Sequence, residues 1–135
     1  MNKLKWWLRI VGARALILGI VGLWASFFNP QLVATPLPMS LAADELAVRA
    51  FSDANIDIGL VTLVLGVLML YASREPSRAS GLVLTVAMLE LFAWTIANLL
   101  WMLRGWPPAN VIPFTIQHFI IGVTGLLFLR QAKAE

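Results

Sequence analysis

The chain has 135 residues, of which 60% are hydrophobic and 13% charged, and its mean hydropathy is +0.83. About a quarter of the residues in soluble domains are charged, so this composition excludes a soluble protein and predicts an integral membrane protein, whose basic residues belong in cytoplasmic loops rather than on nucleic acid. The absence of cysteine excludes disulfides, thiolate nucleophiles and Cys-ligated metal.

Four apolar stretches are long enough to cross a membrane as helices, since about 20 residues at 1.5 Å per residue span the hydrocarbon core of ~30 Å. We predict an all-α integral membrane protein in which residues 1–135 form a single domain. Its fold is expected to be an up-and-down bundle of four transmembrane helices, at about residues 10–28, 56–73, 81–103 and 111–129.

The basic residues predict the orientation of this bundle. Arg49 and Arg104 fall on one side of the four helices, and all other Lys and Arg residues fall on the opposite side: Lys3, Lys5, Arg9, Arg14, Arg74, Arg78, Arg130 and Lys133. Because cytoplasmic loops carry the excess of Lys and Arg, both termini are expected in the cytoplasm.

The first predicted helix follows a basic and aromatic flank of the kind that anchors a helix at the cytoplasmic interface. Arg14 interrupts its apolar stretch, so we expect a membrane helix that stays in place rather than a cleaved signal peptide. Small residues recur at steps of three and four, which lets another helix approach closely. They are Gly12, Ala15, Gly19, Gly22 and Ser26 here, and Gly59, Thr62, Gly66 and Ser73 on the second predicted helix.

Residues 29–55 form the largest predicted outer segment. Asn29-Pro30 ends the first helix, and Pro36 and Pro38 keep the chain extended, because proline lacks an N–H donor and restricts the residue before it. From Ser40 the mixture of apolar and charged residues predicts a short amphipathic helix at the membrane surface, which can continue into the second transmembrane helix.

Asn55 and Asp57 lie at the outer mouth of the second predicted helix. They can bind a cation or cap the helix, and capping is favoured because a carboxylate in the first turn suits the helix dipole. A single histidine without cysteine predicts no metal site, no haem and no other cofactor.

Glu90 is the least expected residue of the third predicted helix, because an ionisable group in lipid is costly and normally points into a bundle. Steps of three and four place Trp94, Asn98 and Trp101 on the same face. Trp94 and Asn98 would line any interior cavity above Glu90, although such side chains at helical spacing are more often bundle core.

His118, the only histidine, is the expected partner of Glu90. Both lie about 14 to 16 Å from the inner ends of their helices, and the short turn at 104–110 makes these helices neighbours. The pair can act as a proton relay or substrate site, or as a structural clamp, which is the more frequent role of intramembrane polar pairs. Arg14, about 6 Å into its predicted helix, can reach Glu90 or snorkel to the interface, and snorkelling is favoured.

Several stretches of the chain resemble one known family. They are KWWLRIVG (Lys5 to Gly12), DIGLVTLVLGVLMLYASREP (Asp57 to Pro76), LELFAW with RGWP (Leu89 to Trp94, Arg104 to Pro107) and QHFIIGVTGLLFLR (Gln117 to Arg130). Together they resemble the BphX-like family of small four-span bacterial membrane proteins, named for genes that lie among those for the breakdown of biphenyl and other aromatic compounds. The resemblance implies a place in the bacterial inner membrane and a link to aromatic-compound metabolism, with no assigned activity and no catalytic residues to carry over.

Two functions stay open. The favoured one is a noncatalytic accessory or interaction module, because the small-residue faces suit partner helices, whether of a second copy or of another membrane protein. The alternative is a small proton-coupled transporter or permeation element that uses Glu90 and His118, with protons or an apolar aromatic molecule as its cargo. An enzyme needs a nucleophile or a metal cluster, so we expect no enzymatic activity and name the lipid bilayer as the one certain partner.

Overall fold

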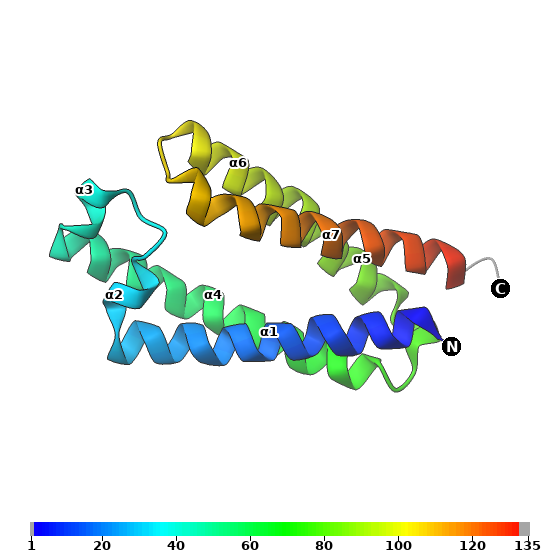
Figure 1. Ribbon diagram of the computed structural model, residues 1–135. Helices are drawn as coiled ribbons and strands as arrows, with labels where there is room; N and C mark the ends of the chain where they lie inside the picture. The colour runs from blue at the N-terminus through cyan, green and yellow to red at the C-terminus, as the bar shows by residue number, and fades with distance from the viewer. Residues whose placement is uncertain (1, 133–135) are drawn as a thin grey trace.

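The computed structural model describes residues 2–132, which are helical except at the turns between helices (Figure 1). Four helical rods make up most of the chain, and each is long and apolar enough to cross a membrane. They are α1 (Lys3–Phe28), α4 (Glu45–Ala72), a third rod of α5 (Ser80–Met88), η2 (Leu89–Thr95) and α6 (Ile96–Leu103), and α7 (Pro108–Ala132). The predicted all-helical chain with four candidate membrane spans is therefore confirmed, while Lys133 of the predicted basic side lies outside the described residues.

The rods form two antiparallel hairpins (Figure 1). One hairpin pairs α1 with α4 and the other pairs the α5–η2–α6 rod with α7, with the short helix η1 (Pro76–Arg78) in the turn between them. The hairpins lie closest at the end that carries both chain termini and diverge toward the end that carries α2 (Pro30–Val33) and α3 (Met39–Ala42).

Small residues let α1 and α4 pack closely. A Cβ atom on Gly19 would lie 2.9 Å from the Gly59 carbonyl oxygen, and one on Gly66 would lie 2.7 Å from the Leu16 amide nitrogen. The predicted small-residue faces of the first two helices therefore pack on each other inside one hairpin. Ser52 adds a hydrogen bond by donating its hydroxyl to the Ser26 carbonyl at 3.0 Å.

Two helices begin earlier than the sequence predicts. α1 starts at Lys3 rather than near residue 10, because the Asn2 side chain caps it by accepting the Lys5 N–H at 3.0 Å. The Asp44 side chain likewise accepts the N–H groups of Leu46 and Ala47, at 2.9 and 3.2 Å, and starts α4 at Glu45. The predicted amphipathic stretch thus continues into the second long helix, which is the alternative that the sequence left open, since residues 45–55 are the first turns of α4.

Two apolar clusters lie at opposite ends of the hairpins. The cluster at the terminal end joins both hairpins through buried side chains that include Trp7, Leu8, Met69 and Val83. The cluster at the other end joins the 30–44 connection to α4 and to the turn before α7: Ala34, Leu37 and Val48, with Phe51 and Trp106 against them. The site described below lies between these clusters.

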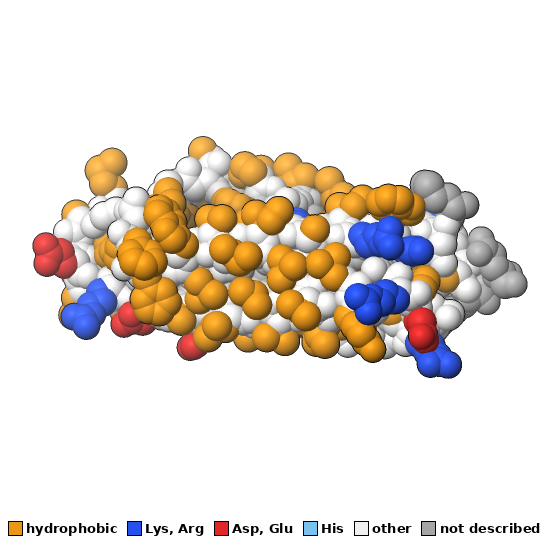
Figure 2. Space-filling model, turned by 90° about the horizontal axis from the view of Figure 1, so that it is seen from below, with side chains coloured by type: hydrophobic (Ala, Val, Ile, Leu, Met, Phe, Trp, Pro, Cys, Tyr) orange, Lys and Arg blue, Asp and Glu red, His pale blue; other side chains and the backbone are white. Residues whose placement is uncertain are grey.

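The outer surface of the α1–α4 hairpin is an apolar band between two charged ends (Figure 2). Lys and Arg side chains gather toward the end with the termini, whereas Asp and Glu lie mostly toward the opposite end (Figure 2). An apolar band with charges confined to its two ends is what a helical bundle presents to lipid, and it indicates a multi-pass membrane protein.

Candidate functional site

A cluster of polar side chains lies midway along the bundle, where the two hairpins meet. Glu90 on η2 is 8% exposed, and its carboxylate oxygen Oε2 contacts Nδ1 of His118 on α7. The other carboxylate oxygen lies 3.8 Å from Nη1 of Arg14 on α1. Arg14 also donates through Nη2 to the side-chain oxygen of Gln117 at 2.9 Å. These four residues, called the polar cluster below, thus connect α1 with both rods of the other hairpin.

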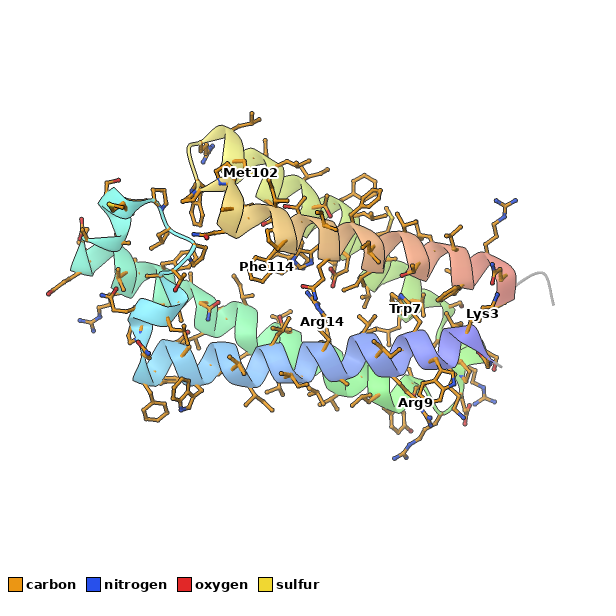
Figure 3. The ribbon with its side chains drawn as sticks, viewed as in Figure 1. Lys3, Trp7, Arg9, Arg14, Met102 and Phe114 are labelled. Carbon is orange, nitrogen blue, oxygen red and sulfur yellow. The ribbon has the colours of Figure 1, made fainter. Side chains whose placement is uncertain are left out.

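The position of Arg14 corrects the prediction that its side chain would snorkel to the interface. Figure 3 shows Arg14 pointing from α1 toward α7, whereas Arg9 points away from the second hairpin. Because α1 begins at Lys3, Arg14 lies about three turns into the helix, roughly 16 Å from its start, which is the depth of Glu90 in its own rod. At that depth the guanidinium group pairs with the buried Glu90 carboxylate inside the bundle.

Glu90 lies in a π-helical segment, Leu89–Thr95, within the third rod. The wider π turn bonds residues five apart, and the Thr95 hydroxyl donates to the Glu90 carbonyl at 2.8 Å, which is the same spacing. Such segments are rare inside helices and recur at functional sites. The polar face predicted from helical spacing survives this distortion, since Glu90 and Asn98 are buried while Phe92 and Ile96 are exposed.

A cavity of about 150 Å³ lies next to the polar cluster on the side of the diverging hairpin ends. The His118 ring stacks on Trp94 with centroids 5.8 Å apart and planes 19° apart, and both rings line the cavity. Asn98 also lines it, is 4% exposed, and has an amide nitrogen without an acceptor among residues 2–132. The rest of the wall consists of Pro36, Trp101, Asn110, Val111 and Phe114.

A second hollow, a groove of about 360 Å³ between α1 and α7, lies on the other side of the polar cluster. Arg14 and Gln117 supply its polar atoms, and the remaining lining is aliphatic: Ile10, Val11, Pro113, Ile116, Ile120 and Ile121. Glu90 therefore lies between two hollows, bonded to one residue from each wall: His118 from the cavity and Arg14 from the groove.

Asn55 and Asp57 do not cap a helix or form part of this site. Because α4 begins at Glu45, both lie well inside it, so the prediction that they cap the helix is wrong. Asn55 instead donates its amide to the Gly22 carbonyl at 3.2 Å and to the Ser26 hydroxyl at 2.8 Å, which ties α4 to α1. Asp57 is exposed, and no group of three potential metal-binding side chains occurs in the described part of the chain.

The structure brings together five residues singled out from the sequence: Glu90, His118, Arg14, Trp94 and Asn98. Sequence analysis missed Gln117 as the partner of Arg14, and it missed Phe114 and Asn110 as cavity residues. The sequence does hold a signal for Gln117, since an amide beside a histidine in an apolar helix is itself unusual. Comparison with protein-family models, curated proteins and solved structures finds no match to this chain.

Proposed function

We propose that this chain is a small transporter or permeation element for protons, in which Glu90 and His118 carry the proton. One observation supports this function above others: Glu90 lies between two hollows and is bonded to a lining residue of each. A protonated carboxyl group that contacts an imidazole can pass its proton to the ring, and both side chains can hold and release a proton.

The charges of the polar cluster favour such an exchange. Arg14 and Glu90 balance each other when both are ionised, so His118 can be neutral or protonated without leaving a carboxylate unpaired. With Nδ1 of His118 engaged by Glu90, the ring has Nε2 left for exchange, and this ring forms part of the cavity wall. The cavity side then supplies or receives the proton.

The packing of the hairpins supports a transporter that alternates between two shapes. The hairpins diverge away from the end with the termini (Figure 1). They share an apolar cluster at the terminal end, and the polar cluster lies between that cluster and the diverging ends. Arg14 and Glu90 form an ion pair between the hairpins, and a change in charge at Glu90 alters this attraction. Protonation would thus bias how the hairpins sit against each other.

An accessory or interaction module is the second candidate. The observation in its favour is that Glu90 already has two partners and the Arg14 guanidinium has two, so the cluster can serve as a clamp between hairpins. In that case the small-residue faces of α1 and α4 do not bind the helix of a partner protein, because they pack against each other. The partner would have to bind the exposed apolar band instead.

We place the chain in the bacterial inner membrane with both termini in the cytoplasm, in keeping with the resemblance to BphX-like proteins. The concentration of Lys and Arg at the terminal end supports this orientation (Figure 2). Single cysteines at Ser77 and Ala43, which belong to turns at opposite ends of the helices, should react with a membrane-impermeant thiol reagent from opposite sides.

Proton uptake by vesicles tests the proposed function. Full-length protein is reconstituted into liposomes that contain a pH-sensitive dye, and a potassium gradient with valinomycin drives protons inward. Wild-type vesicles should acidify faster than protein-free vesicles, and Glu90→Gln should return the rate to the protein-free value. Glu75→Gln is the matched control, because Glu75 is an exposed carboxylate paired with Arg78 at 3.0 Å.

His118→Gln is a second variant in case Glu90→Gln does not fold, and it should lower the rate as well. Equal rates in wild-type and protein-free vesicles would overturn the transporter. So would a Glu90→Gln or His118→Gln rate equal to that of Glu75→Gln, and the accessory module would then be preferred.

A further inference from the structure

We propose that the cavity beside His118 is a binding site for a flat, single-ring aromatic carbonyl compound, whose oxygen accepts a hydrogen bond from Asn98. This inference goes beyond the proposed movement of protons, because it rests on the cavity wall and not on the titration of the polar cluster. Three features of the cavity support it: the unpaired Asn98 amide, the volume of the cavity and its aromatic wall.

The unused donor is the side-chain amide of Asn98. It is 4% exposed, and its nitrogen has no acceptor in the described part of the chain. A buried N–H group without an acceptor has lost its hydrogen bonds to water without replacement, so nearly all such groups in folded proteins are paired. The other amide on the wall, that of Asn110, already donates to the Thr35 carbonyl at 3.1 Å. An acceptor from outside the chain would give the Asn98 amide nitrogen its missing hydrogen bond.

A largely apolar molecule suits this wall better than water alone. A buried water normally makes two to four hydrogen bonds with polar partners. Among the lining residues, Nδ1 of His118 is engaged by Glu90 and the Asn110 amide by Thr35, while the other five apart from Asn98 are one proline, one valine and three aromatic residues. The Asn98 amide and Nε2 of His118 are left as polar contacts, which suits an acceptor carried by a largely apolar molecule.

The volume and the walls define that molecule. A cavity of about 150 Å³ is the size that accepts a benzene ring in a protein interior. Trp94, Trp101 and Phe114 form much of the wall, and Figure 3 shows Phe114 pointing from α7 into the space between the hairpins. Aromatic rings in stacked or edge-to-face contact gain attraction beyond that of the apolar area they bury, so a planar ring suits this wall better than an acyl chain.

The 30–44 connection lies at one end of the cavity and is held there by a hydrogen bond to α7. Pro36 lines it from the 30–44 connection, and the Asn110–Thr35 hydrogen bond holds this connection to α7. Trp101 stacks on Trp106 with centroids 4.7 Å apart, which fixes the ring on the opposite wall. The site is thus formed by helices with a loop residue, Pro36, at its edge, as ligand sites commonly are.

Fluorine NMR on the full-length protein in lipid nanodiscs tests this site with two probes of similar size. 4-Fluoroacetophenone carries a carbonyl acceptor, and 4-fluoroethylbenzene lacks one. We expect saturable binding of both, with the ketone bound about tenfold more tightly because it alone pairs the buried amide. Asn98→Leu should remove this tenfold preference and leave the affinity for the hydrocarbon unchanged.

Asn29→Leu is the matched control, since Asn29 is an exposed asparagine at the end of α1. It should bind both probes as the wild type does. Saturable binding of neither probe, equal affinity for the two in the wild type, or a preference that persists in Asn98→Leu would each overturn the site. Because Asn98→Leu replaces an unpaired buried amide by an apolar group of similar size, it should fold, and its hydrocarbon binding reports that the cavity is intact.

The two proposals fail in different experiments. Selective ketone binding without Glu90-dependent proton uptake would overturn the transporter and leave the binding site. Glu90-dependent uptake without selective ketone binding would overturn the binding site and leave the transporter.

Discussion

The two helix interfaces of this chain are built on different principles. Within the first hairpin, α1 and α4 pack through glycines so closely that a Cβ on Gly19 would lie 2.9 Å from the Gly59 carbonyl oxygen. Between the hairpins, the middle of the interface is polar and hollow: Arg14 of the first hairpin meets Glu90 and Gln117 of the second, with the groove on one side and the cavity beside His118 on the other. The first interface has one close-packed arrangement, whereas the second depends on charge.

This difference separates the part of the molecule that is rigid from the part that can respond to its surroundings. Close van der Waals packing between small residues is lost at once if either helix moves, so α1 and α4 are expected to move as a unit. An ion pair weakens when its carboxylate takes up a proton, and empty space beside it leaves room for side chains to rearrange. Function therefore belongs at the interface between the hairpins.

The largest expected effect is that of removing the cation of the polar cluster. Arg14→Leu leaves Glu90 buried with His118 as its remaining partner and leaves Gln117 without its donor. Breaking a buried pair in this way should lower the free energy of unfolding by about 3 kcal/mol. Arg9→Leu is the control, because Arg9 is exposed and lies over the Trp6 ring at 5.5 Å. Equal denaturation curves for the two variants in detergent would contradict the buried ion pair.

The next effect concerns the close-packed interface. Gly19→Leu places a side chain where the Gly59 backbone and Leu63 already lie, so α1 must move away from α4 at a cost of about 2 kcal/mol. Gly81→Leu adds the same side chain in open space at the start of α5 and should be nearly neutral. A melting temperature unchanged by Gly19→Leu would show that the two helices are not held by this contact.

The smallest effect contrasts two asparagines, one from each interface. Asn55 donates to Gly22 and Ser26, so Asn55→Leu should lower stability by about 1 kcal/mol. Asn98 has no acceptor for its amide nitrogen, so Asn98→Leu should raise stability by about 1 kcal/mol in the absence of a ligand. Parallel urea titrations measure both changes, and effects of the same sign would remove the contrast.

The sequence predicts the four rods and the face on which Glu90 lies, because hydrophobic length and helical spacing are local properties. It does not predict where α1 and α4 begin, since both starts depend on a single capping side chain, Asn2 or Asp44. A helix start near residue 10 places Arg14 close to the interface, whereas the observed start at Lys3 places it about three turns into the helix. The π segment around Glu90 also could not be predicted, because a change from four-residue to five-residue hydrogen bonds has no periodic signature.

Which side chains meet between different helices is the other feature, and the sequence predicts it only in part. Equal depth suggested that Glu90 and His118 meet, and they do. The hydrogen bond between Arg14 and Gln117 depends on the rotation of α7 about its axis relative to α1. Residue spacing within one helix does not determine that rotation. The pairing of the small-residue faces of α1 and α4 with each other, rather than with a second copy, was undetermined for the same reason.

The energetic coupling of Glu90 and His118 tests the central claim most directly, because the proposed proton carrier requires these two residues to act as a unit. The measurement is a double-mutant cycle of His118→Ala and Glu90→Gln, with unfolding followed near neutral pH in detergent. Each single change should destabilise the protein, and the double variant should recover part of the loss, with a coupling energy of about 1 to 3 kcal/mol. Additive losses would contradict the account, since they would mean that the carboxylate and the imidazole are neighbours without being partners.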